Sequence, residues 1–265
     1  LDIVFFPDIG MSTEFYYLSF IRFAKIQITS WGHPITTSNA SIDYFLSSKL
    51  LETSNAQERF SEKLILSDYL PMYFYKPKIK NILLDSEIVK KNHYFCSQNL
   101  MKIHPHFDEI IGKILKKDKK SKIFFIKDKN EIISNKLLKR FKSSNLIDLD
   151  RVSFIEKMGV DDYVNLCGSS SVLLDTLYFG AGNSFHESMF YGTPTVTLPT
   201  NFLRSKIVEG AYKNLEIKDA PVVKNVDDYV SSAVEIANLN PKKTLEIKKY
   251  YAECADKNLF QNKNA

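Results

Sequence analysis

From about residue 92 onward, short apolar runs alternate with stretches in which apolar residues recur every three or four positions. The short runs predict buried strands, and the longer period predicts helices that each place one face on a core. The expected strands are residues 94–96, 122–126, 152–155, 172–174 and 195–198, and the expected helices between them are 105–115, 131–140, 161–166 and 183–191. Strands that are separated by helices favour a parallel, doubly wound sheet.

The first part of the chain is less regular. Its expected strands are residues 2–7, 25–31 and 42–47, and its expected helices are 13–24 and 56–64. Residues 69–77 hold two prolines and several aromatic residues without a helical period, which indicates a connection between two lobes. Helices over 226–239 and 242–258 close the chain. We therefore expect an N-terminal lobe over 1–80, a nucleotide-sugar-binding Rossmann-like lobe over 81–235 and a helical segment over 236–265.

The stretch from Leu174 to Glu187 is the most informative part of the sequence. An apolar run ends in Asp175, a turn with two glycines follows, and a helix begins at Asn183. The start of a helix has free N–H groups and the positive end of its dipole, which favour a phosphate. Glu187, one turn into the helix, is placed to accept hydrogen bonds from ribose hydroxyls. An ordinary Rossmann-like crossover explains the same pattern equally well, so both interpretations stay open here.

Composition narrows the class of protein. The chain has 265 residues, 44% of them hydrophobic and 13% aromatic, which is typical of a globular protein. The net charge of +5 suits anionic small molecules, and the lysine-rich run at 116–122 is interpreted as a solvated loop rather than a nucleic-acid surface. No apolar run approaches the roughly 18 residues of a membrane span. We expect neither nucleic-acid nor membrane partners.

Cysteine usage and the chain start add two expectations. Cys96, Cys167 and Cys254 are odd in number and lack Cys-x-x-Cys spacing, so neither a disulfide framework nor a zinc site is predicted. A reducing, cytoplasmic location fits this pattern. The chain begins with Leu1 inside an apparent strand, which indicates a fragment.

Six ordered blocks of sequence resemble a known family. They are 2–11, 26–34, 42–48, 61–65, 96–105 and 174–199. The chain is similar to the catalytic region of the O-linked N-acetylglucosamine transferases, including bacterial tetratricopeptide-bearing relatives and the plant SPINDLY branch. The resemblance implies an α/β fold of the GT-B type, with two Rossmann-like lobes of which the N-terminal one is incomplete. It also implies inverting, metal-independent transfer of a sugar, expected to be N-acetylglucosamine from UDP-GlcNAc, to Ser or Thr of a protein acceptor. No cofactor or metal is expected.

The resemblance assigns roles to particular residues. Lys102 is expected to meet the donor diphosphate and to neutralise the departing nucleotide, and Gln98 to contact the donor, although Gln98 precedes Lys102 by four residues and not by the three of the mammalian form. Tyr163 falls where the family places a residue over the nucleotide base. The phosphate-binding turn would be Gly182-Asn183-Ser184, where many relatives have Thr and the mammalian members a preceding His. Arg204 is expected to close on the phosphates.

The sequence is less specific about which residue accepts the proton from the acceptor hydroxyl. His33, in Trp-Gly-His-Pro, and Asp8, at the end of the first strand, are the two candidates. Each assignment has a structural alternative, namely an exposed lysine at 102, turn residues at 33 and 8, a core tyrosine at 163 and a surface ion pair at 204. Asp148-Leu149-Asp150 matches a metal-binding pattern but is interpreted as loop acids, and His104 and His106 have no further ligand at metal spacing.

Other functions stay open at this point. The donor could be GDP-fucose or UDP-glucose, and the chain could bind a sugar nucleotide without turning it over. Nucleic-acid binding through lysines and the aromatic residues at 73–75 is a weaker alternative.

Overall fold

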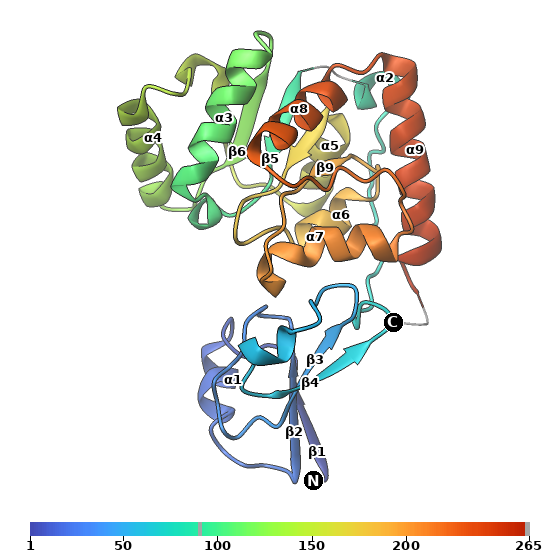
Figure 1. Ribbon diagram of the computed structural model, residues 1–265. Helices are drawn as coiled ribbons and strands as arrows, with labels where there is room; N and C mark the ends of the chain where they lie inside the picture. Colours follow the sequence, from blue (N-terminus) through green and yellow to red (C-terminus); the bar gives the residue numbers. More distant parts are fainter. Residues whose placement is uncertain (90–91, 263–265) are drawn as a thin grey trace.

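The computed structural model describes residues 1–89 and 92–262, and Figure 1 shows two lobes. The N-terminal lobe (residues 1–68) holds a four-stranded parallel sheet in the order β1-β2-β3-β4, and the C-terminal lobe (92–258) a five-stranded parallel sheet in the order β7-β6-β5-β8-β9. The first sheet consists of β1 (Ile3–Phe6), β2 (Ile26–Ser30), β3 (Tyr44–Ser48) and β4 (Lys63–Ser67). The second consists of β5 (His93–Cys96), β6 (Lys122–Ile126), β7 (Val152–Ile155), β8 (Val172–Leu174) and β9 (Thr195–Val196).

The helices follow the strands in sequence. They are α1 (Thr13–Leu18), α2 (Asp85–Ile88), α3 (Pro105–Lys117), α4 (Ile132–Ser144), α5 (Val160–Ser169), α6 (Asn183–Ser188), α7 (Leu203–Asn214), α8 (Val226–Ala237) and α9 (Pro241–Asn258). Short 3-10 turns are η1 (Ala56–Arg59), η2 (Leu100–Lys102) and η3 (Leu149–Arg151).

The C-terminal sheet is covered on both faces. Successive residues of β5 point to opposite sides, so Tyr94 joins the core under α3 and α8 while Phe95 joins the core under α5. On the first side Phe107 of α3 meets Tyr229 of α8, with ring centroids 6.1 Å apart. Strands that are buried on both faces read as continuous apolar runs, which is why the sequence pattern located them. The prediction of one parallel sheet with helices on both faces is confirmed.

The N-terminal lobe differs from its prediction in two places. The helix expected at 56–64 is wrong, because only the η1 turn forms and the chain then enters β4. The apolar run at 64–66 pairs with β3, with Phe45 opposite Leu64. The Gln57 side chain closes the turn by accepting a hydrogen bond from the Leu64 N–H at 2.9 Å. The helix expected at 13–24 ends already at Leu18. Outside this lobe, the helices α2 and α7 were not predicted.

A single apolar cluster joins the two lobes. Trp31, Phe45 and Leu51 of the N-terminal lobe pack in it with residues of α6, α7 and α9. The approach is close at Gly210 of α7, where an added Cβ would lie 2.3 Å from Cδ2 of Leu51. The lobes are therefore held together by apolar contact and not only by the connecting chain.

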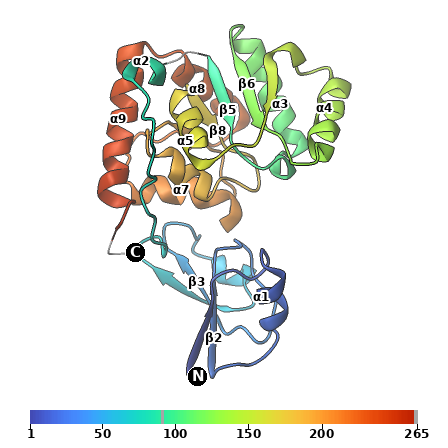
Figure 2. The ribbon, with the colours of Figure 1, turned by 180° about the vertical axis from the view of Figure 1, so that it is seen from behind.

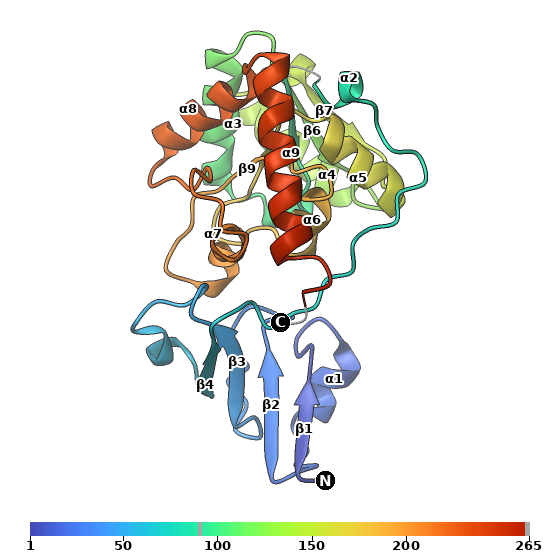
Figure 3. The same ribbon diagram turned by 90° about the vertical axis from the view of Figure 1, so that its right-hand side faces the viewer.

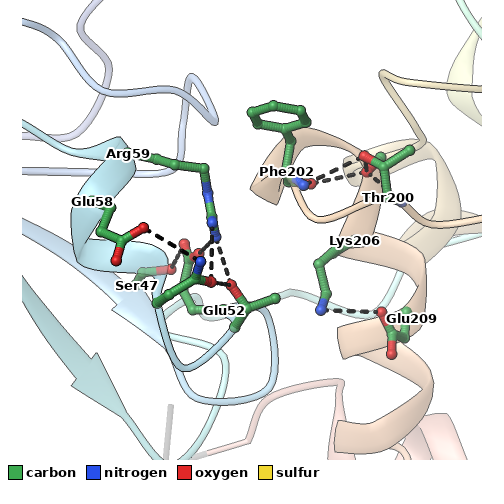
Figure 4. Close-up of polar contacts among 11 residues, drawn as sticks. Ser47, Glu52, Glu58, Arg59, Thr200, Phe202, Lys206 and Glu209 are labelled. Carbon is green, nitrogen blue, oxygen red and sulfur yellow. Dashed lines mark hydrogen bonds and ion pairs between the residues drawn. The ribbon is translucent and has the colours of Figure 1, made fainter.

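Polar groups of both lobes face one another beside this cluster (Figure 4). Glu52 accepts a hydrogen bond from the Ser47 hydroxyl at 2.9 Å, and Arg59 lies 3.9 Å from its other oxygen. Lys206 and Glu209 of α7 form an ion pair of 3.6 Å on the opposite side. Burial raises the pKa of Glu52, whose side chain is 1% exposed.

The linker (residues 69–84) runs along the C-terminal lobe between α5 and α9 (Figure 2). Phe74 pairs with Phe260 through an isolated parallel bridge, which brings the segment after α9 to the linker. In Figure 3, α9 runs along the C-terminal lobe, where the buried Lys248 donates hydrogen bonds to the carbonyls of Ile88, Gly168 and Ser170. Burial lowers the pKa of Lys248 to about 7.

The expected domain boundaries at 80 and 235 stay a prediction, and positions 90–91 and 263–265 of those segments lie outside the described residues. Among the helices that the structure describes, none combines the length and apolar character that a membrane crossing requires.

Candidate functional site

The loop between β8 and α6 is organised by a buried acid. Asp175 follows β8 directly and is 2% exposed. Its Oδ1 accepts the Ala181 N–H at 2.7 Å, and its Oδ2 accepts the Thr197 hydroxyl at 2.6 Å. A Cβ at Gly180 would lie 2.8 Å from Oδ2, so any other residue there would force the carboxylate or the loop to shift. Burial raises the pKa of Asp175 to about 6.

Asp175 was not among the predicted site residues. A charged residue at the end of a buried apolar run, followed by a glycine turn, was the signal available, because a buried carboxylate needs hydrogen-bond partners close by. Asp175 acts as the anchor of the loop that leads to α6.

Lys102 ends the η2 turn after β5 and reaches across to this loop. Its Nζ donates to the Gly180 carbonyl at 2.8 Å and to Gln98 Oε1 at 3.2 Å, and it lies 4.5 Å from the centroid of the Phe179 ring. Burial lowers its pKa, and the nearby Asp175 carboxylate opposes that shift. Lys102 is thus a partly buried cation beside the start of α6, not the solvent-exposed lysine of the alternative interpretation.

Gln98 and Tyr163 hold the first turn of α6. The Gln98 amide donates to the Ser184 hydroxyl at 2.9 Å, and the Tyr163 hydroxyl donates to the Ser184 carbonyl at 3.1 Å. Gln98 is 4% exposed and Tyr163 9% exposed, so both belong to a fixed framework. The Tyr163 ring packs in the core with Phe95, as a core tyrosine would, and it also lines a hollow at the surface.

Three hollows formed by the described residues border α6. The C-terminal-lobe hollow, of about 400 Å³, lies within the C-terminal lobe and is lined by residues that include Ser97, Asp128, Val160, Tyr163, Ser184 and Glu187. The interlobe hollow, also about 400 Å³, is lined by residues of both lobes that include His33, Lys102, Gly182 and Asn183. The linker hollow, of about 280 Å³, lies between Met72–Pro77 and α6. Burial raises the pKa of Glu187, which lines the first and third hollows.

The two candidate proton acceptors are placed differently. His33 lines the interlobe hollow, with its ring 6.4 Å from that of Phe179. Its Nδ1 is buried and has no hydrogen-bond partner among the described residues. Asp8 accepts the Met11 N–H at 3.1 Å, as a turn-forming acid does, and it does not line the three hollows. The structure therefore brings His33 to the site and leaves Asp8 at its edge.

Arg204 supports the loop before α6. Its Nε donates to the Tyr178 carbonyl at 3.1 Å, its own carbonyl accepts the Gly180 N–H at 2.8 Å, and its guanidinium carbon lies 5.0 Å from the Phe202 ring centroid. Tyr178 has a positive φ of 68°, which is uncommon for a residue with a side chain. Arg204 contributes to holding that conformation, and it does not line the three hollows.

The residues weighed as metal ligands have other contacts. Asp148 accepts the Asp150 N–H at 3.3 Å and pairs with Arg151 at 2.8 Å, which caps the η3 turn. His104 accepts the His106 N–H at 3.2 Å at the start of α3. Within 1–89 and 92–262, no group of three or more His, Cys, Asp or Glu residues is arranged to hold a metal ion.

Comparison with known proteins supports the resemblance. No model of a protein family matches the chain. The UDP-glucose:protein N-beta-glucosyltransferase of Actinobacillus pleuropneumoniae is 26% identical over 95% of this chain and 40% of its own length. A probable UDP-N-acetylglucosamine–peptide N-acetylglucosaminyltransferase of Arabidopsis thaliana, SEC, is 22% identical over 83% of the chain and 23% of its own length. The chain thus spans less than half of the curated relatives it matches.

Solved structures share the fold. A mutant of the Thermobaculum terrenum O-GlcNAc transferase superimposes with a TM-score of 0.85 at 16% identity, over 97% of this chain and 49% of that one. Sucrose-phosphate synthase of Thermosynechococcus elongatus superimposes with a TM-score of 0.65 at 11% identity, over 97% of this chain and 69% of that one. The expected resemblance to the O-linked N-acetylglucosamine transferases and the expected GT-B-type α/β fold are confirmed.

Proposed function

We propose that this chain is the catalytic region of a glycosyltransferase that moves a sugar from a UDP-linked donor to a protein. The observation that carries the proposal is the position of Lys102, a partly buried cation between the loop and the first turn of α6. The relatives named for UDP-sugar transfer to proteins or peptides support the same class of reaction.

The donor would lie around the start of α6. The nucleoside would occupy the C-terminal-lobe hollow, with Glu187 accepting hydrogen bonds from the ribose and Tyr163 near the base. The diphosphate would lie between Lys102 and the backbone of Asn183 and Ser184, because a helix start and a lysine both favour negative charge. Gln98 would contact the donor through the interlobe hollow, which it also lines.

This arrangement would stabilise the departing nucleotide. Negative charge grows on the phosphate as the bond to the sugar breaks, and a fixed cation in a partly desolvated site stabilises that charge. Lys102 supplies this charge without a metal ion. His33 is the titratable residue that the N-terminal lobe contributes to the lining of the interlobe hollow, where it would take a proton or contact the acceptor.

The sugar and the acceptor are narrower proposals. The sequence resemblance favours N-acetylglucosamine and a Ser or Thr hydroxyl, whereas the Actinobacillus relative is named for glucose and for an N-linked product. We propose UDP as the nucleotide and treat glucose and N-acetylglucosamine as the two sugars to be tested first. No comparison named above favours GDP-fucose.

A thermal-shift series tests the donor site. The purified chain would be heated with UDP, UDP-glucose, UDP-GlcNAc or GDP-fucose in EDTA. A ligand at about 100 times its Kd adds roughly 2.7 kcal/mol to the free energy of unfolding, which is a readily measured rise in Tm. We expect the rise with UDP-linked ligands in the absence of divalent ions. A rise that appeared only after manganese was added would contradict metal-independent binding.

A donor-hydrolysis assay then separates an enzyme from a binding module. Slow release of UDP from the bound donor supports a catalytic site, because water replaces the missing acceptor. Donor binding without UDP release, also in the presence of protein acceptors, would favour a module that binds the sugar nucleotide without turnover.

A further inference from the structure

Helix α6 presents two different edges to the hollows around it. Ser184 and Glu187 line the C-terminal-lobe hollow, and Asn183 and His186 do not. Ser184 also lines the interlobe hollow, and Glu187 also lines the linker hollow. Asn183 and His186 both line the interlobe hollow and the linker hollow. Residues three apart lie on the same side of a helix, so each pair forms one edge.

His186 is the unusual member of the second edge. It is 2% exposed, and neither of its ring nitrogens has a hydrogen-bond partner among the described residues. The ring of Phe74, from the linker, lies over the imidazole with centroids 3.8 Å apart. A buried polar atom without a partner destabilises a protein, so two on one side chain call for an explanation.

The imidazole is neutral in this environment. Burial lowers the pKa of His186 to about 3, so around neutral pH one ring nitrogen carries a hydrogen and the other has a lone pair. The group can therefore donate one hydrogen bond and accept another. A sugar hydroxyl has the complementary capacity, because it both donates and accepts.

We propose that His186 contacts the sugar of the donor and contributes to its selection. The inference rests on the proposed function, in which the nucleoside lies along the edge formed by Ser184 and Glu187. The sugar is attached to the other end of the diphosphate, so it extends away from that edge and toward Asn183 and His186. Because Phe74 covers the imidazole, this contact requires the linker to shift when the sugar binds.

Two substitutions separate this role from simple packing. His186→Phe keeps an aromatic ring against Phe74 and removes both nitrogens, and His186→Gln keeps one donor and one acceptor. The Phe variant should be as stable as the wild type or more so, because two unpartnered polar atoms are lost. His186→Leu serves as a second apolar variant if the Phe ring does not fit.

The measurement is the affinity of each protein for UDP, UDP-glucose and UDP-GlcNAc by calorimetry. We expect the Kd for UDP to be the same in all variants. For at least one UDP-sugar, the ratio of its Kd to that of UDP should rise roughly 5- to 100-fold in the Phe or Leu variant and recover in part in the Gln variant. Ratios that match the wild type for both sugars in a folded apolar variant would overturn the proposal. Failure of the wild type to bind UDP at all would instead refute the proposed function, and this inference with it.

Discussion

The two parallel sheets differ in how well their faces are covered. In the C-terminal lobe β8 is fully buried, and helices lie on both faces of the sheet. In the N-terminal lobe Ile3 is 57% exposed, Phe5 49% and Ile65 41%, so part of that sheet faces solvent in this chain. Parallel sheets gain their stability from cover on both faces. The C-terminal sheet is therefore covered by helices of its own lobe, whereas the N-terminal lobe buries Trp31, Phe45 and Leu51 in a cluster that it shares with α6 and α7.

The candidate site follows the same division. Lys102, Gln98, Ser184 and Glu187 all come from the C-terminal lobe, on segments joined by partly buried hydrogen bonds. Of the site residues expected in the N-terminal lobe, His33 lines a hollow and Asp8 does not. The proposed function therefore assigns nucleotide binding to the C-terminal lobe and sugar transfer to both lobes together.

The largest expected effect comes from the cation of the C-terminal lobe. Lys102→Ala should lower turnover by about 30- to 1000-fold, because the stabilisation of the leaving phosphate is lost in the transition state. The affinity for the donor should change less than turnover, since this negative charge is absent from the bound donor and grows on the phosphate only as the bond to the sugar breaks. Initial rates at saturating donor and the Kd of the same UDP-sugar measure the two quantities.

Two controls make this test specific. Lys136→Ala removes an exposed lysine of α4 and should leave turnover unchanged. His33→Ala, in the N-terminal lobe, should lower turnover while the Kd of UDP stays the same. A His33 variant with weaker UDP binding than the Lys102 variant would contradict the division between the lobes.

The next effect concerns the buried acid of the site loop. The pKa of Asp175 is about 6 when folded, above its value of about 4 when unfolded. The folded state therefore holds this proton more tightly, and the free energy of unfolding falls as the pH rises from about 4 to 6, then stays lower. Relative to Asp175→Asn, the wild type should lose roughly 2 kcal/mol between pH 4.5 and 7 in urea titrations.

Glu52 offers the matching test in the N-terminal lobe. Burial raises its pKa as well, so Glu52→Gln should change the pH dependence of stability in the same direction. For the Asp175 test, free energies of unfolding of the wild type and Asp175→Asn that change in parallel with pH would show that the Asp175 carboxyl is not held as the structure indicates.

A smaller effect is expected at Glu187. Its carboxylate would accept hydrogen bonds from the ribose, so Glu187→Gln should weaken UDP binding roughly 3- to 10-fold near pH 7.5. Burial raises the pKa of Glu187, and protonation removes acceptor capacity. UDP binding by the wild type should therefore weaken as the pH falls, and calorimetry should show a flatter pH profile for the variant. Equal pH profiles of UDP binding for the wild type and Glu187→Gln would show that Glu187 does not contact the ribose.

The sequence predicted the sheet of the C-terminal lobe and its helices other than α7, because the two signals used there are local. Buried strands are continuous apolar runs, and the helices between them carry regular stripes, as in α3. The N-terminal lobe was predicted less well, since β4 depends on pairing with β3 and its apolar residues at 64–66 also fit a helix. Pairing between distant segments leaves no periodic signal in either one.

The prediction of the candidate site from sequence has the same limit. Motifs placed Lys102, Gln98 and Glu187 around α6, and the structure brings them there. The anchoring role of Asp175 and the unpartnered nitrogens of His186 were not predicted. Both depend on which backbone and ring atoms surround a buried group, and that is set by tertiary packing and not by spacing along the chain.

In the proposed function the donor diphosphate lies between Lys102 and the start of α6, and a crystal structure of the chain with UDP would show whether it does. We expect a phosphate oxygen about 3 Å from Lys102 Nζ, with the Asn183 or Ser184 N–H on the same phosphate and the ribose at Glu187. UDP bound with its phosphates on Arg204, while Lys102 still donates to the Gly180 carbonyl, would contradict it.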